Sequence, residues 1–209
     1  MSELFSIQLQ NRQQQGRDGV WLDLPTTTEQ VQAALRQIGI SSDNPQGLFI
    51  SGYFAEEEKR FAIPYNMVLT SNVDELNFLA SRLETLSTGE RTELNAALQA
   101  PQSELFSIGR ITDFPENVDY YVHLPDVHGP AQLGDYYLNR SGMVDMPEEW
   151  KGGIDTAQFG RYVAQQEQGV FTEYGYLVKS GDEWQKVHEG QPVPEEYRVL
   201  SFPASMLIL

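Results

Sequence analysis

The chain has 209 residues, 40% of them hydrophobic and 11% aromatic, which is enough to bury a core in one domain or in two to three small modules. Thirty Asp and Glu against fourteen Lys and Arg give a net charge of −16, which argues against nonspecific nucleic-acid binding because phosphate contacts need Lys and Arg. The absence of cysteine excludes disulfides and thiolate metal sites. No apolar run could span a bilayer, and the N-terminus has no secretory pattern, so we expect a cytoplasmic protein.

The first part of the chain predicts a small sheet with one helix. Residues 4–10 alternate apolar and polar side chains, and residues 20–24 predict a second strand after a polar loop. Thr26 and Glu29 form a capping-box pattern before apolar residues at helical spacing. Residues 47–54 then predict a third strand.

The middle of the chain predicts helices. Asn72 with Glu75, and Ser87 with Glu90, repeat the capping-box pattern, and each pair precedes leucines and alanines at helical spacing. A further short helix is predicted at 103–111.

The last part of the chain predicts a mixture of strands and helices. We expect a strand at 118–124, a short helix or extended stretch at 131–139, and a strand at 170–178. Asp155 is expected to cap a helix over 156–168. Prolines punctuate an extended tail after these elements.

Together these elements predict an elongated α+β protein of three small modules. They are an N-terminal sheet–helix module at 1–62, a helical module at 63–112 and an acidic α/β module at 113–209. The motif SELFSI occurs at both 2–7 and 103–108, which leaves open an ancient duplication or a coincidence.

The steepest charge imbalance lies between residues 113 and 155, where nine acids face only Arg140 and Lys151. A solvated acidic surface would explain this stretch, and so would a surface that offers carboxylates to a basic partner. On the second interpretation the candidate partner-binding residues are Asp113, Glu116, Asp119, Asp126, Asp135, Asp145, Glu148, Glu149 and Asp155.

Two other groups of residues have the types needed for a chemical site. His123, Asp126 and His128 are the donors of a two-His, one-carboxylate metal site, although two histidines on a surface loop are the simpler interpretation. Three carboxylates spaced i, i+3, i+6 in 113–119 could serve a glycoside hydrolase, but Pro115 interrupts any helix that would align them. Motifs for a nucleophile, a phosphate-binding loop or a zinc site are missing. We therefore expect no catalytic, cofactor or metal site.

Several segments, in order, resemble ArdA-type antirestriction proteins. GVWLDLP at 19–25, followed by a short amphipathic helix and GLFISGYF at 47–54, resembles the opening of these proteins. LNFLA at 76–80 and FGRY at 159–162 match further along the chain. GVFTEYGY at 169–176 is similar to the longer members found on conjugative elements of Firmicutes.

The resemblance implies an acidic, elongated, homodimeric protein without enzymatic activity or cofactor. Proteins of this kind mimic bent duplex DNA, occupy the DNA-binding groove of type I restriction–modification enzymes and protect incoming mobile-element DNA. The expected partner is therefore a protein, and neither a nucleic acid nor a membrane. An acidic adaptor for another basic protein is the alternative from a different functional class, and a carboxylate hydrolase is the third.

Overall fold

The computed structural model describes residues 4–14, 18–41, 44–56, 60–101 and 103–200. The protein is α+β with two small antiparallel sheets, which confirms the predicted class. Packing groups the described residues into two units. Unit 1 comprises the described residues of 1–86, 105–116 and 186–209. Unit 2 comprises those of 87–104 and 117–185. The predicted helical module thus contributes residues to both units, and the three-module division stays a prediction.

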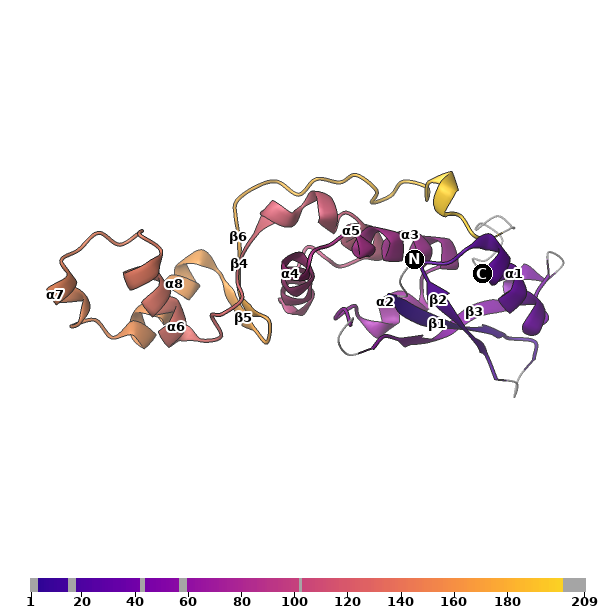
Figure 1. Ribbon diagram of the computed structural model, residues 1–209, viewed down its shortest axis with the longest axis horizontal. Coiled ribbons are helices and arrows are strands. Elements are labelled where there is room, and N and C mark those ends of the chain that lie inside the picture. The colour runs from indigo at the N-terminus through magenta and orange to yellow at the C-terminus, as the bar shows by residue number, and fades with distance from the viewer. Residues whose placement is uncertain (1–3, 15–17, 42–43, 57–59, 102, 201–209) are drawn as a thin grey trace. The chain divides into compact units, whose positions relative to one another are not determined.

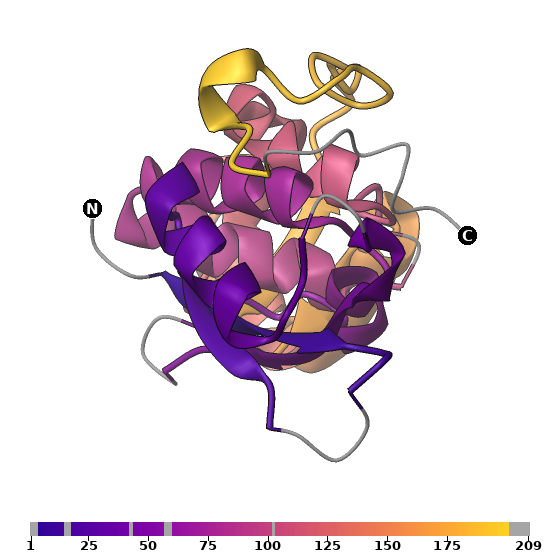
Figure 2. The same cartoon turned by 90° about the vertical axis from the view of Figure 1, so that its right-hand side faces the viewer.

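Unit 1 contains a three-stranded antiparallel sheet in the order β2-β1-β3. Its strands are β1 (Phe5–Asn11), β2 (Val20–Leu24) and β3 (Leu48–Phe54). The first two predicted strands are present and pair antiparallel, with Ile7 opposite Leu22. Alternation places the apolar side chains on one buried face. Figure 2 shows the helices of unit 1 on one side of this sheet.

Four α-helices complete unit 1. They are α1 (Thr28–Gln37), α2 (Tyr65–Leu69), α3 (Val73–Glu84) and α5 (Ile108–Thr112), and 3-10 turns lie at Pro45–Gly47, Phe114–Glu116 and Glu195–Tyr197. The capping box of α3 is formed by Asn72 and Glu75, as predicted. That of α1 is formed by Thr27 and Gln30, one residue later than predicted. α2 was not predicted, because it is short and has no side-chain cap.

The C-terminal strap, residues 186–200, packs onto unit 1 through polar side chains of α3. The Asp74 carboxylate accepts hydrogen bonds from the backbone N–H groups of Val199 (2.7 Å) and Leu200 (2.9 Å). The Asn77 side chain donates to the carbonyl of Tyr197 and accepts from the N–H of Thr26. The extended tail expected from the sequence is therefore a tightly bound part of unit 1.

Unit 2 contains the second sheet and four α-helices. Its helices are α4 (Thr88–Gln99), α6 (Pro130–Asp135), α7 (Glu148–Lys151) and α8 (Thr156–Glu167), with a 3-10 turn η4 (Val118–Tyr120) and a π-helical turn η5 (Tyr136–Arg140). Its strands are β4 (Tyr121–Leu124), β5 (Val170–Thr172) and β6 (Gly175–Lys179), in the order β4-β6-β5. Ser87 with Glu90 caps α4, and Asp155 caps α8, as predicted.

Two predictions of where an element begins or ends were wrong. The single strand expected at 170–178 is a tight hairpin, and Gly175 follows its turn with φ +115°. The helix expected to begin at 103 begins at Ile108, because Ser107 is its N-cap. The second SELFSI copy is therefore partly loop and partly helix, while the described part of the first copy leads into β1.

Helices α6 and α8 of unit 2 cross at two glycines. A Cβ atom on Gly160 would lie 1.8 Å from the carbonyl oxygen of Pro130, and one on Gly134 would lie 1.9 Å from that of Thr156. Val127, Leu133, Ala164 and Tyr176 form the buried core beside this crossing. Only glycine permits the two backbones to approach so closely.

Candidate partner-binding surface

The nine acids predicted from the sequence fall into three environments. Asp113 is fully buried, and Glu116 and Asp135 are half-buried. Six are exposed, and all six belong to unit 2: Asp119, Asp126, Asp145, Glu148, Glu149 and Asp155. The structure thus brings most of the predicted surface charges into one unit.

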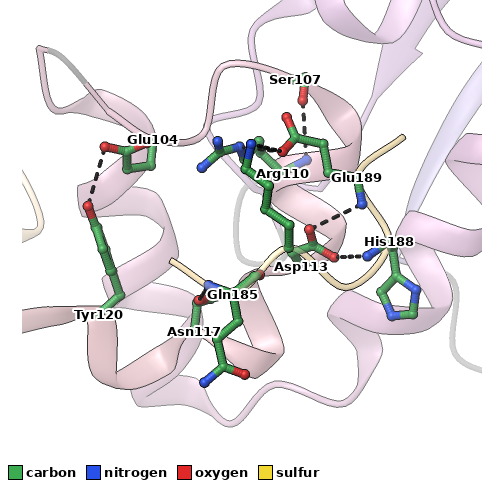
Figure 3. Close-up of polar contacts among 10 residues, drawn as sticks. Glu104, Ser107, Arg110, Asp113, Asn117, Tyr120, Gln185, His188 and Glu189 are labelled. Carbon is green, nitrogen blue, oxygen red and sulfur yellow. Dashed lines mark hydrogen bonds and ion pairs between the residues drawn. The ribbon is translucent and has the colours of Figure 1, made fainter. Parts of the chain in front are cut away.

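Asp113 lies inside unit 1 and is not a surface charge. Its side chain is 0% exposed, and its two carboxylate oxygens accept hydrogen bonds from the backbone N–H groups of His188 (2.6 Å) and Glu189 (3.2 Å) (Figure 3). The prediction that it contacts a partner was wrong, because its carboxylate holds the C-terminal strap. Nothing in the local sequence signals this, since its partners come from 75 residues later.

Ion pairs take up further charge in unit 1. Glu116 pairs with Arg82 of α3, and both side chains are partly buried. Arg110 pairs with Glu189 of the strap at 2.9 Å, and its side chain is 8% exposed (Figure 3). Glu116 therefore contributes little net negative field to the surface.

Short elements and loops of unit 2 carry the exposed acids. Asp119 lies on η4, and Asp126 lies in the loop after β4. Asp145 precedes α7, and Glu149 lies on it. Asp155 accepts a hydrogen bond from the backbone N–H of Gln158 as the N-cap of α8, and its carboxylate remains exposed.

Two of the candidate acids of unit 2 have ion-pair partners at the surface. Asp135 lies 3.3 Å from Arg140, and Glu148 lies 2.7 Å from Lys151. Exposed pairs of this kind are weak, about 0–1 kcal/mol, so either carboxylate can exchange its own cation for one on a partner.

The sequence window 113–155 missed acids that the fold adds to unit 2. Unit 2 as a whole has fourteen Asp and Glu against five Lys and Arg. The additional exposed acids are Glu173, Asp182 and Glu183. Glu173 lies in the turn between β5 and β6, and Asp182 and Glu183 follow β6. Because all three lie outside the window 113–155, the sequence does not indicate that they belong to the same unit as the other exposed acids.

Glu93 of α4 differs from the exposed acids of unit 2 in its protonation state. Its Oε1 atom is buried and has no hydrogen-bond partner among the described residues. Burial, and then the negative charges of Glu90 and Asp119, raise the pKa of Glu93 to about 8. Its carboxyl group is therefore largely neutral at pH 7 and adds little to the acidic surface.

The structure separates the residues of the two alternative chemical sites. Among the described residues no group of three or more His, Asp and Glu could hold a metal ion. The Nε2 atom of His123 hydrogen-bonds to the Tyr174 carbonyl at 2.7 Å, while His128 is exposed. In the proposed hydrolase trio Asp113 is buried and Glu116 is ion-paired, so these carboxylates do not form the facing pair that glycoside hydrolysis needs.

Polar contacts within unit 2 order the region around Asp119. The Tyr120 hydroxyl donates to Glu104 at 3.3 Å, and the side chain of Asn117 both donates to and accepts from the backbone of Gln185 (Figure 3). Lys179 also donates to Glu104, at 2.8 Å. Asp119 lies between two anchored residues, so its carboxylate is presented from a fixed backbone.

Comparison with known proteins identifies the family. The antirestriction protein (ArdA) family model matches residues 15–178, which is more than half of the chain. A search of curated proteins gave no match. Among the helices of the described residues, none is both long enough and apolar enough to cross a membrane. The chain belongs to the ArdA family of antirestriction proteins.

Proposed function

We propose that this protein is a DNA mimic that occupies the DNA-binding groove of a type I restriction–modification enzyme. In this role it protects incoming mobile-element DNA, acts in the cytoplasm as a homodimer and needs neither a cofactor nor catalysis. Membership of the ArdA family is the observation that carries the proposal. The exposed acids of unit 2 support it, because they supply the charge that such a groove attracts.

The physical basis is electrostatic complementarity. Duplex DNA has about one negative charge per 1.7 Å of its axis, and a groove that binds it is lined with Lys and Arg. A surface with Asp119, Asp126, Asp145 and Glu149 exposed presents carboxylates to the same groove. Because each exposed charge contributes little, binding is distributed over many residues, and complementary charge also accelerates association.

Inhibition of a purified type I enzyme tests the proposal. The protein is titrated into a cleavage reaction, and the concentration for half inhibition is measured at increasing DNA. Competition for the groove predicts that this concentration rises with DNA and with salt. Inhibition that is independent of DNA concentration, or an absence of inhibition, would contradict the proposal. An acidic adaptor would instead bind a basic protein without displacing DNA.

A further inference from the structure

The three most exposed large hydrophobic side chains among the described residues all belong to unit 2. They are Met143 at 75%, Trp150 at 69% and Tyr162 at 60%. The first two lie in the connecting segment, residues 141–155, which joins η5 to α8 and contains the short helix α7 (Figure 1). Within one segment the protein therefore exposes a large indole and a long thioether side chain to water.

The exposed aromatic side chains of unit 1 have partners within the chain, and the Trp150 indole has none in the described part. The Trp21 and Phe54 rings contact each other edge to face at 6.5 Å between centroids. Phe106 lies 4.8 Å from the Arg110 guanidinium. The Trp150 indole has no ring contact, cation contact or hydrogen bond with a described residue. An indole left in water is the kind of side chain that dominates binding when a partner buries it.

The charges around Trp150 are negative. Glu149 precedes it on α7, and Asp145 and Asp155 flank the helix, all three exposed. Lys151 is the nearest base in the segment, and Glu148 already holds it at 2.7 Å. A second copy of this chain or an anionic lipid surface would meet like charges here. The complementary occupant is a basic protein surface.

We infer that Trp150, supported by Met143, is an apolar anchor that inserts into an apolar depression within the basic surface of the partner. This inference rests on the proposed function and adds to it a discrete contact that charge mimicry lacks. The acids around the anchor steer and orient the two proteins, while burial of the indole slows dissociation. The two contributions differ in one measurable respect, because salt screens the charges and leaves apolar burial almost unchanged.

Substitution of Trp150 in the full chain tests the anchor. Inhibition of the type I enzyme is measured for the wild type, Trp150→Ala and Trp150→Phe at several salt concentrations. We expect Trp150→Ala to raise the concentration for half inhibition about 30-fold, the loss typical of a central interface tryptophan. The salt dependence should stay that of the wild type, and Trp150→Phe should retain most of the inhibition.

Trp21→Ala is the matched control, because it removes a half-exposed tryptophan from the sheet of unit 1. It should inhibit like the wild type once circular dichroism shows that it is folded. If Trp150→Ala inhibits within twofold of an active wild type, or if it dissociates a dimer of this chain, the anchor is contradicted while DNA mimicry stands. A wild type that does not inhibit contradicts the proposed function, and the anchor with it.

Discussion

The carboxylate of Asp113 accepts a hydrogen bond of 2.6 Å from the backbone N–H of His188, 75 residues later in the chain. A second oxygen of the same group accepts from the N–H of Glu189. Since the side chain is fully buried, these two bonds satisfy a carboxylate that has no access to water. They connect the C-terminal strap to the residue that follows α5.

We expect Asp113→Ala to destabilise unit 1. The change leaves the N–H groups of two partly buried residues without their acceptor, and each lost bond to a charged group costs about 1.5–3 kcal/mol. Because water can reach these partly buried donors once the carboxylate is removed, urea denaturation should show a loss of about 2–4 kcal/mol in the free energy of unfolding, less than the sum for the two bonds. Asp126→Ala removes the same charge from an exposed loop and should change stability by less than about 0.5 kcal/mol. Equal stability of the two variants would refute the role of Asp113.

Gly160→Ala should strongly destabilise unit 2. A Cβ atom at Gly160 would overlap the Pro130 carbonyl oxygen, so α6 and α8 would have to separate and open the adjacent core. We expect the free energy of unfolding to fall by about 3 kcal/mol, measured by thermal or urea denaturation.

Gly89→Ala is the control for this helix substitution. Gly89 lies on α4, and a Cβ atom there would meet nothing within 4 Å. Because alanine is the better helix former, this variant should gain up to about 1 kcal/mol. If both glycine variants lost stability equally, the close crossing would not be the cause.

Removing several exposed acids of unit 2 together should abolish inhibition of the restriction enzyme. Each single change to Asn or Gln is expected to weaken inhibition a few-fold at most, since exposed pairs contribute about 0–1 kcal/mol. The combined variant changes Asp119, Asp126, Asp145 and Glu149. Its losses sum to several kcal/mol, and about 1.4 kcal/mol is tenfold in affinity.

A charge-matched variant of unit 1 separates surface position from net charge. It changes four exposed acids of that unit, namely Asp18, Glu29, Glu195 and Glu196. This variant should inhibit much like the wild type. A single Asp or Glu whose replacement abolished inhibition in a folded protein would contradict a distributed acidic surface.

Glu93 makes the stability of unit 2 depend on pH. Burial raises the pKa of Glu93 to about 8, above its ordinary value of 4.5. The native state therefore holds a proton that the unfolded chain releases, and stability falls as the pH rises from about 4.5 to about 8. Because part of the side chain reaches solvent, we expect a loss of only about 1–2 kcal/mol.

Glu93→Gln should remove this pH dependence. The variant should be about 1–2 kcal/mol more stable than the wild type at pH 8, with a smaller difference at pH 5, by urea denaturation at both values. Glu149→Gln, an exposed control on α7, should follow the wild type. Parallel pH profiles for the wild type and Glu93→Gln would show that Glu93 is ionised in the native protein.

The sequence by itself determined the elements that depend on neighbours in the chain. The capping boxes at Asn72 and Ser87, and the cap at Asp155, act over three residues, and they correctly placed the starts of α3, α4 and α8. Alternation likewise predicted the strands of the first sheet. Elements without such signals, α2 and α7, were missed.

Only the tertiary structure decided which acids face solvent. Asp113 and Asp126 look alike in sequence, each an acid in the same charged stretch. One is buried because the strap returns to bind it, and the other stays exposed on a loop. Burial depends on segments that lie far apart in the chain, and local periodicity contains no information about which of them will meet. The same holds for Trp150, whose exposure arises because no other described segment packs over it.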